Sequence, residues 1–171
     1  MTIIEKYYAM NTALNQALRA QNQTAKVYKY GTVPTVQKYP YFQSSYRVQR
    51  RQPYGSSVSG VLTDFEYTLN FFTAATSDEA NDSALLNPYE IARELITSPE
   101  SMIWRNIAAI LSHSETPGFM LKGGLERLQR GLVFDCQTVT SFVSTIHGGV
   151  EIPVDDVIET IEDILVADEY S

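Results

Sequence analysis

The sequence predicts an α+β protein, with an antiparallel or mixed sheet that contains a long β-hairpin and packs on two to three helices. Two long stretches, 61–71 and 132–146, alternate between apolar and polar residues, the period of a strand with one buried face. Between these stretches, helix start signals occur at Asn87 and Ser98. A length of 171 residues favours a single domain covering residues 1–171.

The first forty residues predict a helix, a short strand and an arm. Apolar residues recur at helical spacing through residues 3–21, which indicates an amphipathic helix. Residues 25–30 alternate and stop at a glycine, as a short strand does. Pro34 and Pro40 exclude a central strand or a helix interior. We therefore expect residues 31–40 to form a flexible arm or loop.

Residues 41–71 are predicted to form the long β-hairpin. The first strand, 41–52, has a weak apolar face and a strongly polar one. Arg50 falls on the apolar phase, so the end of this strand is expected to leave the sheet. The glycine- and serine-rich segment 53–60 has the composition of a hairpin tip, and 61–71 returns as the second strand.

The region after the hairpin predicts two helices, a loop and the second long strand. Asn87 is expected to cap the first helix, with Pro88 at its first position, and the second helix is expected at 98–111. Proline and glycine in 113–124 indicate a loop, followed by a short turn at 125–130. The strand then runs through 132–146.

The C-terminal segment, 153–171, allows two interpretations. Its apolar residues fit a helical stripe that begins near Pro153, and periodicity slightly favours this helix. The same residues are rich in β-branched side chains and alternate well enough to form an edge strand.

Composition and motifs give no support for catalysis, and we expect a protein that is not an enzyme. The chain contains no HExxH, CxxC, GxSxG or phosphate-loop pattern, so no catalytic residue, metal site or cofactor is expected. The single cysteine, Cys136, lies in a strand pattern and is expected to be a small core residue. The N-terminus lacks a signal-peptide pattern and no apolar run is long enough to cross a bilayer, so we expect an intracellular setting and no membrane.

Charge is distributed unevenly along the chain, whose formal net charge is −7. Residues 1–55 hold eight of the thirteen Lys and Arg residues but one acid, and the remainder holds nineteen of the twenty acids. This division predicts opposed charged surfaces that could pair between subunits, unless folding mixes the two halves in space.

The region 26–54 combines six of the thirteen cations with six of the eleven tyrosines. Aromatic rings and cations together suit single-stranded nucleic acid, where bases stack and cations follow phosphates. Tyr and Arg are also enriched at protein interfaces, and Lys and Arg protect sheet edges from aggregation. We favour the protein interface over the nucleic-acid module. The candidate interface residues are Arg47, Arg50, Arg51, Tyr46 and Tyr54.

Several segments carry a family resemblance. A strand starts at Pro40-Tyr41-Phe42, the segment Glu126-Arg127-Leu128-Gln129 runs into the strand 132–146, and the chain ends with VIETIEDI. In this order they resemble the tail terminator proteins (neck or tail-completion proteins) of tailed bacteriophages. The resemblance implies a tail-terminator-like α+β protomer whose last segment, within 153–171, is an edge strand.

The resemblance also implies an assembly function. Members of this family form a hexameric ring that caps the tail tube and joins it to the connector, or adaptor, above. The implied partners are other copies of the chain, the tail tube protein and the connector, while DNA passes through the ring without specific binding. The implied location is the virion, assembled in the host cytoplasm. The alternatives are a head-completion adaptor one ring higher in the neck, or a nucleic-acid module built on 26–54.

Overall fold

The computed structural model describes residues 1–32, 39–53, 60–74, 86–120, 126–141, 145–147 and 150–152. Within these ranges the chain contains two helices and a five-stranded mixed sheet, which confirms the α+β class. The elements, in order, are α1 (Ile3–Ala20), β1 (Val27–Lys29), β2 (Tyr41–Pro53), β3 (Gly60–Ala74), α2 (Asn87–Thr97), β4 (Ala109–Met120), β5 (Glu126–Ser141), β6 (Thr145–His147) and β7 (Val150–Ile152).

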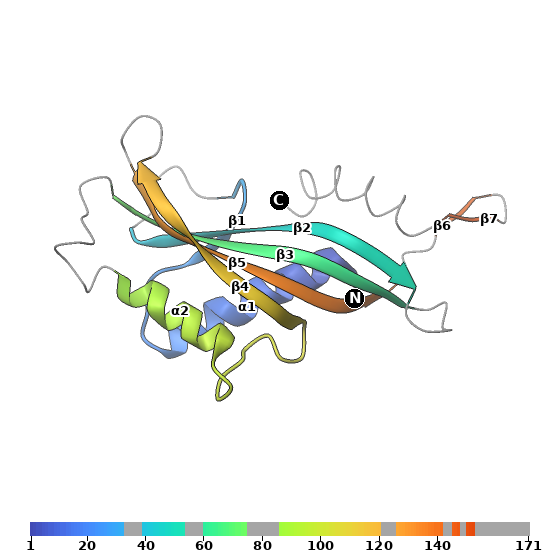
Figure 1. The fold of residues 1–171 in the computed structure, drawn as a ribbon, viewed down its shortest axis with the longest axis horizontal. Helices are drawn as coiled ribbons and strands as arrows, with labels where there is room; N and C mark the ends of the chain where they lie inside the picture. Colours follow the sequence, from blue (N-terminus) through green and yellow to red (C-terminus); the bar gives the residue numbers. More distant parts are fainter. Residues whose placement is uncertain are drawn as a thin grey trace.

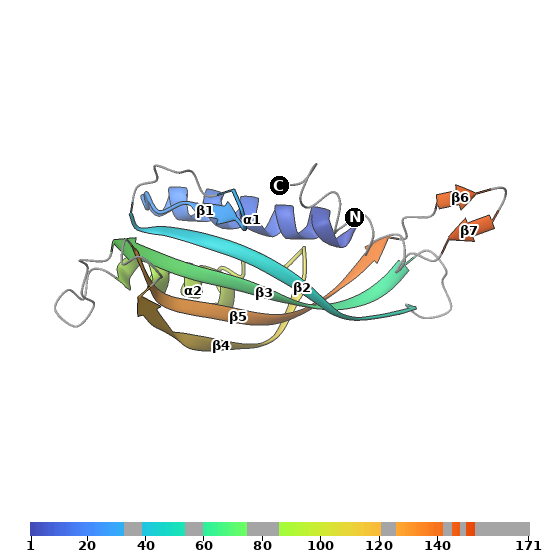
Figure 2. The same ribbon diagram turned by 90° about the horizontal axis from the view of Figure 1, so that it is seen from above.

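The main sheet has the strand order β1-β2-β3-β5-β4, which can be followed in Figure 2. The β1–β2 pair is parallel and the other three pairs are antiparallel. Strand β3 lies at the centre, with β2 on one side and β5 on the other. The two strands expected within 41–71 thus pair antiparallel, and their connection, 54–59, lies outside the described residues.

The alternation of β3 places its apolar side chains under the helices. Val61, Phe65, Tyr67, Leu69 and Phe71 are buried, and they form one core with residues of α1 and α2. The intervening residues of β3 are half-exposed on the other face. Both helices pack on the same face of a long twisted sheet (Figure 1), so among the described elements no helix covers the opposite face. We call that opposite face the open face.

Helix α1 confirms the expected first helix and has a start signal that its periodicity did not reveal. Thr2 is the N-cap, and its hydroxyl accepts a hydrogen bond from the N–H of Glu5, whose side chain returns to the N–H of Thr2. This capping box satisfies backbone donors that a helix otherwise leaves without partners.

The prediction of a helix at 98–111 is wrong. The N–H of Ser98 closes α2 on the carbonyl of Glu94, and Ser98 itself is extended because the proline that follows disfavours helical geometry. The chain then continues in turns, with Met102 at a positive φ of 35°. Trp104 is 1% exposed, and its indole N–H donates to the carbonyl of Met10 in α1 at 2.9 Å. A tertiary contact therefore organises this segment.

The prediction of a loop at 113–124 is also wrong, because Ala109–Met120 form the edge strand β4. Proline is tolerated in an edge strand where its nitrogen faces away from the neighbouring strand, which accounts for Pro117. Gly118 allows close approach, since a Cβ atom there would lie 2.0 Å from the carbonyl oxygen of Leu128 in β5. The proline and the glycine that indicated a loop are thus compatible with this edge strand.

Strand β5 replaces the turn expected at 125–130 and ends before the expected boundary at 146. Thr145–His147 and Val150–Ile152 instead pair with each other in a separate two-stranded sheet. At the start of α2, the capping position is Leu86, without a side-chain cap, and the expected cap Asn87 lies inside the helix. The segment 153–171 and most of the expected arm, residues 33–38, lie outside the described residues.

Candidate interaction surfaces

The open face carries ion pairs between the basic strand β2 and the acidic strand β3. Arg47 lies 3.5 Å from Glu66, and Arg50 lies 3.3 Å from Asp64. The amide of Gln137 in β5 also donates to Asp64 at 2.8 Å. The side chains of Arg47 and Arg50 are 73% and 65% exposed, whereas those of Glu66 and Asp64 are 26% and 20% exposed. The two guanidinium groups therefore remain accessible to a neighbouring molecule.

A β-bulge places Arg50 on the same face as Arg47. The register of β2 against β3 shifts between Val48 and Arg50, so one extra residue occupies β2. Such a bulge changes which face the following residues occupy. The strand continues to Pro53 after the bulge, so the expectation that the chain leaves the sheet at Arg50 is wrong. The phase break in the sequence was the signal of the bulge.

The structure separates the remaining candidate residues from this pair. Arg51 is opposite Thr63, a buried residue of the helix-covered face. Tyr46 packs against the core, with its ring 4.7 Å from that of Tyr7 in α1. Tyr54 lies outside the described residues. Of the five residues predicted for the interface, the structure thus brings together Arg47 and Arg50.

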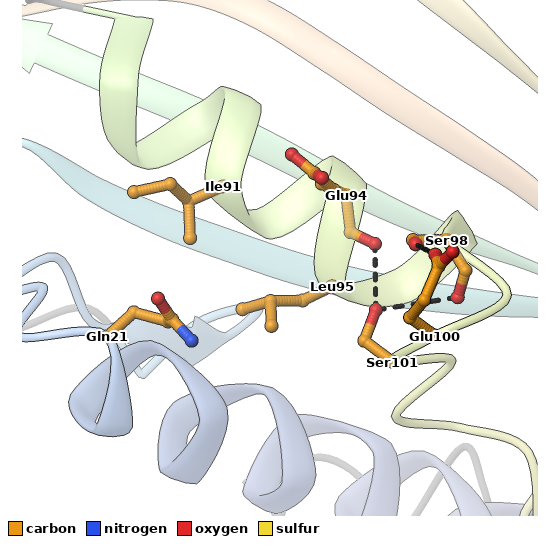
Figure 3. Close-up of a pocket in the computed structure, with 7 residues that line it drawn as sticks. All are labelled: Gln21, Ile91, Glu94, Leu95, Ser98, Glu100 and Ser101. Carbon is orange, nitrogen blue, oxygen red and sulfur yellow. Dashed lines mark hydrogen bonds between the residues drawn. The ribbon is translucent and has the colours of Figure 1, made fainter.

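An acidic groove lies in the helical layer, between the C-terminal end of α1 and the face of α2 with the turn that follows it (Figure 3). The cavity measures about 510 Å³. Ile91 and Leu95 of α2 supply an apolar floor that points toward α1, and Glu94 and Glu100 are the two acidic residues of the lining. The remaining lining residues are Gln21, Ser98 and Ser101.

One local hydrogen bond favours the charged form of a carboxylate in this groove. A hydrogen bond from the Ser98 hydroxyl lowers the pKa of the Glu100 carboxyl, and the hydroxyl of Ser101 donates to the carbonyl of Glu94. The last turn of α2 contains no basic residue, so the partial negative charge of the helix end adds to the two carboxylates. The groove is suited to an arginine- or lysine-bearing partner.

Three tyrosines of 26–54 form one ring cluster, and the other described ones lie apart from it. The ring centroids of Tyr28 and Tyr39 lie 6.0 Å and 5.6 Å from that of Tyr41. Tyr30 is 73% exposed, Tyr41 is buried, and Tyr46 packs against the core. The hydroxyls of Tyr39 and Tyr41 both donate to the carboxylate of Glu126. Two lysines lie over tyrosine rings, Lys26 over Tyr28 and Lys29 over Tyr8. Because Tyr41, at the centre of the cluster, is 2% exposed, the described tyrosines offer no continuous stacking platform.

Buried titratable groups are neutral and enclosed. Burial raises the pKa of the Cys136 thiol to about 12, with a smaller contribution from Asp135, so the thiol is a poor nucleophile at neutral pH. Burial also raises the pKa of Tyr67, whose hydroxyl donates to Asn11. Within the described ranges no cluster of three His, Cys, Asp or Glu residues could hold a metal ion.

Comparisons with known proteins add no relative: neither a scan against protein-family models nor a search of the curated proteins finds a match. Neither helix in the described part of the chain is both long and apolar enough to cross a membrane. Sequence reasoning missed the acidic groove, whose residues come from the ends of two helices and a turn. Glu94 and Glu100, two acids near a predicted helix end, were the available signal, but no local pattern predicts the contact between α1 and α2 that forms the groove.

Proposed function

We propose that this protein is a structural subunit of a bacteriophage neck, a tail terminator that assembles head to tail into a ring. The ring caps the tail tube and joins it to the connector above. Its partners are further copies of the chain, the tail tube protein and the connector, and DNA passes through it without specific binding. The function is therefore assembly in the virion, without catalysis.

The observation that carries this proposal is the placement of two complementary surfaces on different layers of the molecule. Arg47 and Arg50 project from the open face, whereas Glu94 and Glu100 line the groove in the helical layer. Surfaces that differ and lie on different sides cannot satisfy each other within one copy. They can pair between copies in a head-to-tail contact, which forms a ring when the rotation closes.

Two of the segments that carry the family resemblance, at 40–42 and 126–129, are joined to each other, and the third lies outside the described residues. The hydroxyl of Tyr41, at the start of β2, donates to Glu126, at the start of β5, at 2.6 Å. Three residues later, the amide of Gln129 donates to the hydroxyl of Thr73 in β3 at 2.7 Å, and both groups are buried. The residues that resemble the tail terminators thus hold three strands together at one end of the sheet, which gives the motif a physical reason.

The ring is tested by charge reversal followed by charge exchange. We expect purified protein, alone or with tail tubes, to give rings in mass photometry and negative-stain images. The variants Arg47→Glu/Arg50→Glu and Glu94→Lys/Glu100→Lys should each lose the ring while remaining folded by circular dichroism. Arg51 is left unchanged because it lies on the other face.

Mixing the two variants provides the matched control. In an alternating ring every contact joins opposite charges again, so the mixture should restore rings, and with an even number of subunits. The proposal is wrong if no rings form under any of these conditions. The assignment of the contact is wrong if each variant still forms rings, or if the mixture of two folded variants does not.

A further inference from the structure

The edge strand β4 is exposed over most of its length. All nine residues from Leu111 to Phe119 are exposed, and the large side chains of Leu111 and Phe119 are 60% and 57% exposed. Strand β4 ends the sheet order, so its outer N–H and C=O groups have no strand partner among the described residues (Figure 2). An edge strand of this length is a template for pairing with another strand.

The opposite edge of the sheet is protected in a way that β4 is not. In β1, the N–H of Val27 donates to Oδ1 of Asn15 at 2.9 Å, and its carbonyl accepts from Nδ2 of Asn15 at 3.1 Å. The side-chain amide of α1 therefore takes the place of a neighbouring strand. Strand β4 contains no Lys or Arg, the residues that commonly protect an edge. The two edges thus differ, and the sheet can extend at β4.

Two irregularities limit the part of β4 that can pair. The register against β5 shifts between Ile110 and Ser112, and Pro117 lacks an N–H group. The regular stretch is 112–116. Because the nitrogen of Pro117 must face away from β5, the N–H and C=O groups of His113 and Glu115, which are in phase with it, also face outward.

We propose that β4 pairs with β4 of a second copy of this chain, antiparallel about a two-fold axis at Ser114. The contact is isologous, with each copy giving the same strand. In this register His113 is opposite Glu115 of the second copy, and Ser112 is opposite its Thr116. His113 and Glu115 then exchange backbone hydrogen bonds in both copies, and Ser114 faces its own equivalent without such bonds.

The sequence of the strand is complementary to itself in this register. A histidine faces a carboxylate twice, and a serine faces a threonine twice; both are favourable cross-strand pairs. Leu111 lies beside Pro117 of the second copy, so exposed apolar surface is covered at both ends. Glu115 is held by Arg93 and Arg130 of its own chain, which fixes the carboxylate that the histidine approaches.

The contact is independent of the proposed ring. It uses the edge of β4, whereas the ring contact uses Arg47 and Arg50 of β2 and the groove at the end of α2. Either can therefore exist without the other. The variants that test them are also separate, so the failure of one proposal leaves the other standing.

The test places charges on the two-fold axis. Ser114 is exposed, so Ser114→Lys and Ser114→Glu leave the fold intact but put like charges directly opposite each other in the dimer. We expect protein that carries the ring-breaking change Arg47→Glu/Arg50→Glu to dimerise with increasing concentration in sedimentation velocity, and the dissociation constant of that dimer to rise roughly tenfold with either Ser114 variant. An equimolar mixture of the two variants should form a heterodimer. Unchanged dimerisation of both variants, or a mixture that stays monomeric, would overturn the proposal.

Cysteine cross-linking tests the register. Ser114→Cys places two thiols at a cross-strand pair without backbone hydrogen bonds, close enough for a disulfide after local adjustment. Ser112→Cys is the matched control, because Ser112 faces Thr116 and not itself. Mild oxidation should give a covalent dimer of Ser114→Cys and little of Ser112→Cys. If Ser114→Cys gives no covalent dimer, or both give equal amounts, the two-fold at Ser114 is wrong.

Discussion

Replacing Trp104 tests whether one tertiary anchor holds the turn segment between α2 and β4. The indole is 1% exposed, its N–H donates to the carbonyl of Met10, and its ring lies 4.6 Å from Tyr67 and 5.3 Å from Phe134. Trp104→Ala removes all of these contacts and leaves a cavity, which typically costs about 3–5 kcal/mol. Trp104→Phe keeps a ring but loses the hydrogen bond, at about 0.5–1.5 kcal/mol, and some packing volume.

The measurement is urea denaturation followed by far-ultraviolet circular dichroism, because the variants lack the chain's one tryptophan. We expect the free energy of unfolding to fall in the order wild type, Trp104→Phe, Trp104→Ala. Arg105→Ala is the control, since Arg105 is exposed and its change should cost less than about 0.5 kcal/mol. A loss below about 1 kcal/mol for Trp104→Ala would refute the role of Trp104 as the anchor. If that variant does not fold, Trp104→Phe still gives the test.

Two further predictions concern β4 and pH. Gly118→Ala should lower the free energy of unfolding by about 1–3 kcal/mol or more in the same assay, because its Cβ would meet the backbone of Leu128. Gly131→Ala should cost less, because its Cβ would meet mainly side-chain atoms that can move. Equal losses for the two variants would contradict this prediction. Burial raises the pKa of Cys136 to about 12, so its contribution to stability is complete below the unfolded value of about 8.5 and falls by up to about 1.4 kcal/mol per pH unit above it. Urea denaturation from pH 8 to 11 should show a flatter alkaline loss for Cys136→Ala; identical slopes would contradict the assignment.

The sequence predicted the elements whose signals are local and periodic. The alternation of 61–71 gave the central strand with the correct buried face, and the apolar spacing of 3–21 gave α1 within one residue at each end. These predictions succeeded because burial on one face imposes a period of two or 3.6 residues wherever the strand or helix lies.

The predictions failed where a distant contact or a neighbouring strand decides the conformation. The segment 98–111 has apolar residues at helical spacing, but Ser98 precedes a proline, and Trp104 reaches α1 to bind Met10. In β4, Pro117 and Gly118 indicate a loop to any local rule, and they are acceptable in a strand because it lies at the sheet edge and close to β5. Neither the contact with α1 nor the neighbouring strand β5 can be recognised from the local sequence.

The charges of the candidate site could not be placed from the local sequence either. The excess of cations in residues 1–55 predicted opposed charged surfaces unless folding mixed the two halves. The antiparallel pairing of β2 and β3 mixes them, because it sets Arg47 and Arg50 beside Glu66 and Asp64 of the acidic half. The net charge of each half therefore does not describe a surface. In each ion pair the arginine is more exposed than the carboxylate, so the two guanidinium groups remain accessible to a partner. Folding thus brings the basic and the acidic part of the sequence together in local ion pairs. The experiments on the ring depend on the two guanidinium groups that stay exposed.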